Sequence, residues 1–339
     1  MRKSWFKPLL ATAVTVFSFG VASVAQAQAP LKMAYALSQT SHYGAGGDAF
    51  AKSLEASSQG KFKVQQFANS ALGGEREVIE GLQLGTIDLA ILSTGATLNF
   101  VPQTGVFDVP FLMRDLAHAR KVLDGQIGQA MLAEFSKRGL VALAWGEQGF
   151  RHLTNSKRPV VSAADAKGLK IRTTENQVHI TAFRQIGILP TPMAWPEVAT
   201  ALQQGTIDGQ ENPLSVFQAA KLQSVGQKHV TLWGYMNDPL IFVVNKDVWA
   251  SWTPEDREIV RQAAIDAGRE EIAIARKGLV EAGKPLVKEL EALGVTVTDL
   301  NAEQRKAFAD ATKAVYTKWK PQIGTNLVDM AEKAIAARK

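Results

Sequence analysis

The 339-residue sequence contains no cysteine. Disulfide bridges, thiolate nucleophiles, cysteine-ligated zinc and iron–sulfur clusters are therefore excluded. A lipid anchor attached to a cysteine at an export cleavage site is excluded for the same reason. A chain of this length needs no disulfides, because a 150-residue domain already buries roughly 70% of the surface that its unfolded chain exposes. Apolar cores alone are expected to hold the fold together.

A strong excess of charge of either sign is also missing. The formal net charge is +6, and three of the positive charges, Arg2, Lys3 and Lys7, precede residue 28 with no acidic residue among them. The rest of the chain therefore carries only a weak positive excess. Such a bias gives no basis for a nucleic-acid partner, and none is expected.

Long apolar runs are confined to the N-terminus. An uncharged run from Leu9 to Ala22 is followed by Ala25-Gln26-Ala27, the small-x-small pattern that signal peptidase recognises. A membrane-spanning helix needs about 20 apolar residues, so this run is short for an anchor. We predict that residues 1–27 are a cleavable signal peptide and that the remaining chain is a periplasmic protein, not inserted in the membrane. An uncleaved N-terminal anchor is the alternative.

Sequence motifs of the common enzyme classes are missing as well. The histidines show no HExxH or other metal-ligand spacing, and no GxSxG nucleophile motif occurs. Gly44-Ala45-Gly46-Gly47 is neither a GxGxxG dinucleotide motif nor a phosphate-binding loop. The sequence therefore predicts no catalytic residue, no metal site and no cofactor. An exported α/β hydrolase or isomerase, with its residues assembled from distant positions, is the alternative.

Helical and strand patterns alternate through most of the chain, which is typical of an α/β fold. Strands are expected at 31–36, 61–67, 87–92 and 140–145. Helices are expected at 42–58, 75–84 and 116–138. Linkers rich in proline, glycine or serine are missing, so any domains are closely coupled.

A short internal repeat indicates two similar units. Residues 77–88 read EVIEGLQLGTID and residues 197–208 read EVATALQQGTID, with eight identities in twelve positions at a constant offset of 120 residues. Each copy predicts an amphipathic helix, a glycine at its C-terminal end and a following strand. We therefore expect two similar α/β lobes, with chance similarity of a common helix–glycine–strand unit as the alternative.

The C-terminal third is mainly helical in pattern. Thr253-Pro254-Glu255-Asp256 combines an N-cap, a proline at the first helical position and acids in the first turn. The pattern continues to Gly294, with a break expected near 283–285. Because a 30-residue helix is about 45 Å long, this element is expected to span both lobes. A strand at 295–297 and helices at 302–319 and 326–337 are expected to follow.

Four segments together resemble a known family. They are LGGEREVIEGLQLGTIDLAI (72–91), GFRHLTNSKRP (149–159), DAKGLKIRT (165–173) and LPTPMAWPEVATALQQGTIDGQENPL (189–214). They resemble the solute-binding proteins of tripartite ATP-independent periplasmic (TRAP) transporters, over essentially the whole chain after the signal. The DGQENP run is the most specific part.

The resemblance implies a two-lobed periplasmic-binding-protein-like fold that closes on a small organic acid. It also implies delivery of that acid to membrane-embedded TRAP permease subunits, which are driven by an ion gradient. We expect the receptor to be a monomer. A receptor for an ATP-driven transporter shares the two-lobed architecture, but the long helix and the DGQENP segment disfavour it.

The resemblance and the chemistry of the residues predict a carboxylate clamp. Arg172 matches the family's carboxylate-binding arginine, and a guanidinium can meet a carboxylate with two parallel hydrogen bonds. Arg151 matches a second, supporting arginine, with a salt bridge elsewhere as the alternative. Asn212 can bond the same acid through its amide, or cap a helix. Trp195 matches an aromatic wall over the ligand, or belongs to the core.

The opposite lobe is expected to supply further contacts. Glu75 begins a helix, where its charge favours the helix dipole with or without a ligand. Ser93 and Thr94 follow a strand, at the edge where α/β folds place ligands. Small side chains stand here where some relatives carry an acid or an arginine. His42 and Tyr43 begin the first helix and are expected to meet the far end of the ligand, with an ordinary surface position as the alternative.

Tyr235 completes the predicted set of ligand-binding residues. It lies in Trp233-Gly234-Tyr235-Met236, a segment that lacks the histidine some relatives carry here. Together with the small residues after the strand at 87–92, this departure argues against sialic acid as the ligand.

The predicted domains follow from these assignments. Lobe I is expected to comprise 28–148 and 239–277, and lobe II 149–238 and 278–339. Hinge strands are expected near 148–153 and 238–243, where the chain crosses between the lobes. Closure of the lobes is expected to bury the ligand's charge and to strengthen its polar contacts.

We predict that fractionation of the native host recovers the protein in the periplasm, with an N-terminus at or near Gln28. The reasons are the charged, apolar and small-residue order of residues 1–27 and the absence of a cysteine for lipid attachment. Mass spectrometry of the intact purified protein measures the N-terminus. Recovery mainly in washed membranes, with residues 1–27 retained, would contradict the prediction.

Overall fold

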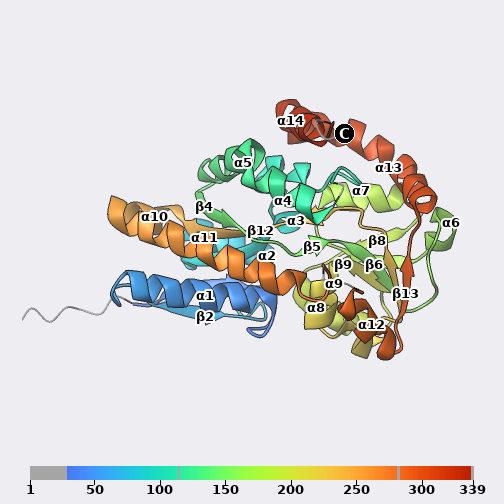
Figure 1. Cartoon of the computed structure of the whole chain (residues 1–339), viewed down its shortest axis with the longest axis horizontal. Helices are drawn as coiled ribbons and strands as arrows, with labels where there is room; N and C mark the ends of the chain where they lie inside the picture. Colours follow the sequence, from blue (N-terminus) through green and yellow to red (C-terminus); the bar gives the residue numbers. More distant parts are fainter. Residues whose placement is uncertain (1–28, 114, 281–282, 337–339) are drawn as a thin grey trace, which may run out of the picture.

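The computed structural model describes residues 29–113, 115–280 and 283–336. The predicted signal peptide lies outside the described residues. Two α/β lobes lie next to each other, and the chain passes between them through short strands (Figure 1). Within the described ranges, no helix is long and apolar enough to cross a membrane.

Lobe I is built on a five-stranded mixed sheet in the order β2-β1-β3-β12-β4. β1 is parallel to β2 and β3, whereas β12 is antiparallel to both of its neighbours. Successive residues of the buried strands point to opposite faces, so Ile91 and Leu92 belong to different apolar clusters. The strands are β1 (Leu31–Tyr35), β2 (Val64–Phe67), β3 (Leu89–Ser93), β4 (Leu140–Trp145) and β12 (Leu240–Asn245).

Helices cover both faces of this sheet. They are α1 (His42–Ser57), α2 (Glu75–Leu84), α3 (Thr94–Thr97), the 3-10 segment η1 (Pro102–Val106), α4 (Leu116–Asp124), α5 (Gln126–Ser136), α10 (Lys246–Ser251) and α11 (Pro254–Arg276). The single helix predicted over 116–138 was wrong. Gly125 has an extended ψ of −168° and separates α4 from α5. Glycine is the weakest helix former after proline, which favours a break here.

Lobe II is built on a six-stranded sheet in the order β13-β10-β6-β9-β7-β8. Its strands are β6 (His152–Asn155), β7 (Lys170–Thr173), β8 (Leu189–Pro192), β9 (Gly209–Asn212), β10 (His229–Leu232) and β13 (Thr296–Asp299). Its helices are α6 (Ala163–Ala166), α7 (Gln177–Gln185), α8 (Trp195–Gln203), α9 (Leu214–Ala219), η2 (Leu222–Val225) and α12 (Pro285–Ala292). Two apolar clusters form its core.

The chain crosses between the lobes close to the predicted hinge segments. β5 (Gly149–Phe150) and β11 (Asn237–Asp238) pair antiparallel as a separate two-stranded ribbon. β5 lies between β4 of lobe I and β6 of lobe II along the chain, and β11 lies between β10 and β12. The ribbon therefore holds both crossings side by side.

The sequence repeat corresponds to equivalent parts of the two lobes. Gly85 (φ 76°) follows α2 and Gly205 (φ 69°) follows α8, both in the left-handed region that favours glycine. In each copy the final aspartate accepts a backbone hydrogen bond at the start of a parallel strand, Asp88 from Lys32 N and Asp208 from Lys170 N. β3 and β9 then each lie between a parallel and an antiparallel neighbour.

The C-terminal helices connect the lobes. α11 packs against α1 and β4 of lobe I, and α12 packs against β13 of lobe II, so the predicted long element passes between the lobes as two helices. α13 (Ala302–Ile323) begins against the lobe II core through Phe308 and ends in the lobe I core through Ile323. α14 (Thr325–Ala336) packs on η1, α4 and α5 of lobe I, whereas the predicted domains placed it in lobe II.

We predict that Thr253→Ala lowers the free energy of unfolding by about 1 kcal/mol, because the hydroxyl of Thr253 accepts a hydrogen bond from Asp256 N (3.1 Å) and caps α11. Urea denaturation measures this change. Thr317→Ala, on an exposed position of α13, removes the same atoms without a cap and is the control. Equal stabilities of the two variants would show that the capping box contributes nothing.

Candidate functional site

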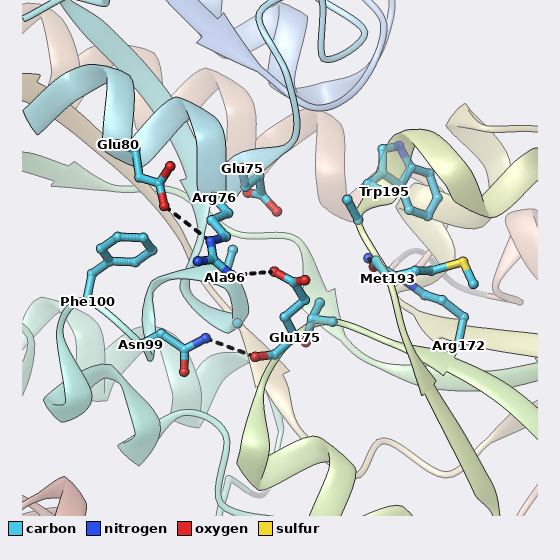
Figure 2. A pocket seen from close by; sticks show the side chains of 13 residues that line it. Glu75, Arg76, Glu80, Ala96, Asn99, Phe100, Arg172, Glu175, Met193 and Trp195 are labelled. Carbon is cyan, nitrogen blue, oxygen red and sulfur yellow. Dashed lines mark hydrogen bonds and ion pairs between the residues drawn. The ribbon is translucent and has the colours of Figure 1, made fainter. Parts of the chain in front are cut away.

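A small cavity of about 20 Å³, the chamber, lies between the lobes. Its volume is about that of one water molecule. The residues that line it come from both lobes and the crossing: Ala36, Leu37, Tyr43, Glu75, Ser93, Gln148, Arg151, Arg172, Thr174, Trp195, Asn212 and Val216. The chamber adjoins a wider pocket of about 320 Å³, and the two share Glu75, Arg172, Thr174 and Trp195 (Figure 2).

Arg172 is a buried cation without a carboxylate partner. It lies in β7, and its Nε and Nη2 donate to the carbonyl oxygen of Met193 (3.0 and 2.9 Å). No described carboxylate lies within ion-pair distance of it. Burial lowers the pKa of Arg172 to about 10, so the guanidinium is charged at neutral pH. Its Nη1 and the remaining Nη2 proton stay available for a bidentate contact with an anion.

Trp195 forms a wall beside this cation. It is the first residue of α8, and its ring centroid lies 5.7 Å from Cζ of Arg172. Trp195 belongs to lobe II but is also packed against an apolar cluster of lobe I. It therefore both lines the chamber and contributes to the contact between the lobes.

Arg151, in contrast, is fully engaged in ion pairs. Its Nε and Nη2 donate to the Glu211 carboxylate (2.5 and 2.8 Å), and Nη1 donates to Asp238. Burial acts to lower the pKa of Arg151, but the charges of Glu211 and Asp238 outweigh it and raise the pKa. The structure thus places Arg151 at the chamber wall, with its charge already balanced by the protein.

Tyr235 belongs to the same buried network and does not line the chamber. Its hydroxyl donates to Glu211 Oε2 (2.7 Å), and its ring packs against Trp233 and Phe183 in the lobe II core. Burial raises the pKa of Tyr235 well above its ordinary value. Its hydroxyl therefore helps to hold the Glu211 carboxylate in place.

Asn212 ends β9 and faces the chamber. Its Nδ2 donates to Gln210 Oε1 (2.5 Å). Pro213, not Asn212, occupies the N-cap of α9, so the alternative helix-cap role is not observed.

The lobe I residues face the chamber to different degrees. Glu75 Oε1 accepts from Ser93 N (2.6 Å). Ser93 Oγ donates to Asp238 (2.8 Å), and Thr94 Oγ1 lies 3.4 Å from the same carboxylate. Ser93 lines the chamber, whereas Thr94 is not among its lining residues. Both hydroxyls therefore bond to Asp238 of β11, one strand of the ribbon through which the chain crosses between the lobes.

His42 and Tyr43 begin α1 as predicted, but only Tyr43 lines the chamber. His42 is buried beside it, and its Nε2 has no hydrogen-bond partner in the described part of the chain. Burial lowers the pKa of His42 to about 3, so its ring is neutral at physiological pH.

Several residues of the site were missed from the sequence. Glu175 lies at the mouth of the wider pocket, where Arg76 Nη1 of the opposite lobe approaches it at 3.8 Å (Figure 2). Asn99 Nδ2 donates to the Glu175 carbonyl oxygen (3.0 Å). Thr174 lines both cavities. A signal existed, because Thr174 and Glu175 follow the same strand as Arg172 and strand ends bear ligand residues in α/β folds.

A two-lobed α/β fold that encloses an unpaired arginine at the junction of its lobes defines a binding protein for an anionic solute. Among the described residues, no group of three or more side chains is arranged to hold a metal ion. The chain belongs to the bacterial extracellular solute-binding protein family 7, whose model matches residues 33–322.

Similar proteins cover almost the whole chain. A TRAP periplasmic solute-binding protein from Bordetella bronchiseptica, with density interpreted as pantoate, is 58% identical with a TM-score of 0.85, over 91% of this chain and 99% of that one. One from Ralstonia eutropha H16, with bound (S)-2-acetolactate, is 45% identical with a TM-score of 0.89, over 92% and 100%. A solute-binding protein from Verminephrobacter eiseniae is 46% identical over 92% and 91%.

We predict that Glu75 makes stability fall as pH rises. Burial raises the pKa of Glu75 from 4.5 to about 7, although the bond from Ser93 N and the charge of Arg172 act in the opposite direction. Between these values the folded protein holds a proton that the unfolded chain releases. Glu75→Gln should therefore match the unmodified protein below pH 4.5 and exceed it by about 1–3 kcal/mol above pH 7.

Thermal unfolding between pH 4 and pH 8 measures the difference. Glu77→Gln, on an exposed position of the same helix, removes the same charge and is the matched control. A stability difference for Glu75→Gln that is constant with pH would contradict the raised pKa.

Proposed function

We propose that this protein is a periplasmic receptor that captures a short 2-hydroxy monocarboxylate and delivers it to TRAP permease subunits. The observation that carries this proposal is the buried guanidinium of Arg172, which has free donors and no carboxylate partner among the described residues. An uncompensated buried charge is costly, and a ligand carboxylate would compensate it.

The second polar group of the ligand is inferred from the same chamber and from the relatives. Pantoate and acetolactate, found in the two similar structures, both carry a hydroxyl on the carbon next to the carboxylate. Asn212 and Glu75 line the chamber together with Arg172 and offer groups for such a hydroxyl. The chamber alone is too small for the whole ligand, so its carbon skeleton would extend into the adjoining pocket of about 320 Å³, where Trp195 supplies apolar wall.

Binding without turnover is the function that this chamber supports. Its lining residues include no histidine, and Ser93, the hydroxyl that a hydrolase would use, is bonded to Asp238. A nucleophilic serine needs a base that accepts its proton and is itself oriented by a third group. In this proposal residues 1–27 direct export, and the receptor acts as a monomer, since one chain supplies the whole chamber wall.

We predict that Arg172→Ala weakens binding of pantoate or acetolactate by about 30-fold to several-thousand-fold, because it leaves a buried carboxylate unpaired. Arg172→Lys should also bind much more weakly, since an ammonium lacks the planar fork. Isothermal titration calorimetry measures both. Arg184→Ala, on the exposed surface of α7, is the control.

Neutral sugars and amines should give no heat of binding in the same titrations. Tight binding of a neutral sugar would overturn the assignment of ligand class. If folded Arg172→Ala protein bound the acid within threefold of the unmodified protein, the position of the site would be wrong.

A further inference from the structure

A second large cavity lies away from the chamber, on lobe I. It has a volume of about 610 Å³ and runs beside β4, between α4–α5 and α11. Figure 1 shows α5 and α11 on opposite sides of β4. We call it the arginine groove. Its lining residues are Arg120, Leu123, Asp124, Gln129, Leu132, Leu143, Ala144, Trp145, Arg261, Ile265, Arg269, Ile272 and Arg276.

Arginines outnumber carboxylates among the residues that line the groove, but most of them are paired. Arg120 pairs with Asp124 at i,i+4, and its Nη1 is buried and closed to the groove. Arg261 has no ion pair with any described residue and lies over Trp249, with Cζ 5.2 Å from the ring centroid. The groove therefore offers the guanidinium of Arg261 to an anionic partner.

The remaining arginines mark the outer edge and the inner end of the groove. Arg269 is 73% exposed and contacts Asp266 at 3.0 Å, a pair of the kind that contributes little. Arg276 pairs with the buried Glu147 at the crossing between the lobes (2.7 and 2.5 Å). The groove thus extends along lobe I and ends at the hinge, without reaching the chamber that we assign to the organic acid.

The floor of the groove is apolar. Leu132, Ile265 and Ile272 line it from α5 and α11, and Leu143 lines it from β4. β4 is the outermost strand of its sheet and pairs only with β12. An elongated hollow with an apolar floor and cationic walls fits a chain segment, whereas a flat cationic face would suit a membrane surface.

We propose that the arginine groove docks an extended acidic segment of a partner protein, with carboxylates against Arg261 and Arg269 and apolar side chains on the floor. Arginine suits this task because its planar fork binds carboxylates bidentately and is weakly hydrated. The proposal does not rest on the identity of the organic acid, since the groove and the chamber share no residue.

The test uses a dye-labelled ten-residue peptide in which glutamate and valine alternate, with fluorescence anisotropy as the readout. We expect saturable binding to the full-length exported protein that weakens at least tenfold between 50 and 300 mM salt, because the contacts are ionic. The double variant Arg261→Glu with Arg269→Glu should weaken binding at least tenfold further.

The control changes net charge by the same amount elsewhere. Arg184→Glu with Lys313→Glu lies on exposed positions of α7 and α13 and should leave peptide affinity within twofold. Ile265→Trp fills the groove without a change of charge and should also weaken peptide binding. Titration with the organic acid should give unchanged affinity in all three variants, which separates a failure here from a failure of the proposed function.

Two results would overturn the proposal. One is the absence of peptide binding up to millimolar concentration, or equal binding by the groove variant and its charge-matched control. The other is loss of binding to phosphatidylglycerol vesicles in the groove variant without loss of peptide binding, which would assign the arginines to a membrane surface.

Discussion

The buried ion pairs of Arg151 hold together the place where the lobes meet. This one guanidinium binds Glu211 at the end of β9 and Asp238 in the crossing ribbon. Asp238 in turn accepts from Ser93 at the end of β3. Removal of one partner of such a buried network typically costs 3–5 kcal/mol, because the other charge stays buried and unpaired. The strand ends that carry the site are therefore fixed by charges that are already paired within the protein.

Because Arg151 is neutralised by the protein, Arg172 is left as the cation that needs an external partner. Its Nε side is occupied by the Met193 carbonyl oxygen, which fixes the plane of the guanidinium and directs its other edge. Glu75 lines the same chamber, and burial raises its pKa to about 7, so about half of it is protonated at neutral pH. The protonated form does not repel an incoming anion, and it can donate a hydrogen bond to it.

The sequence predicted more of the fold than of the site, for physical reasons. Capping residues and left-handed glycines act locally, so the start of α11 and both repeat glycines were found from the sequence. The sequence did not predict that Arg151 is paired within the protein whereas Arg172 is not. That difference depends on Glu211 and Asp238, which lie 60 and 87 residues from Arg151. The sequence likewise did not predict that Tyr235 faces the core, because its orientation depends on tertiary packing against Trp233 and Phe183.

The closed arrangement itself follows from residues that serve two lobes at once. Trp195 stacks beside Arg172 in lobe II and packs against the lobe I core, so the wall of the chamber is also an interlobe contact. Arg76 and Glu175 meet across the pocket mouth at 3.8 Å while both remain exposed, a pair worth little by itself. The Arg76–Glu175 pair thus contributes little to closure of the lobes. The unpaired, buried charge of Arg172 opposes closure, because it is costly to desolvate. In the proposed function a bound carboxylate would remove that opposition, and this differential interaction would let the solute shift the equilibrium toward the closed form.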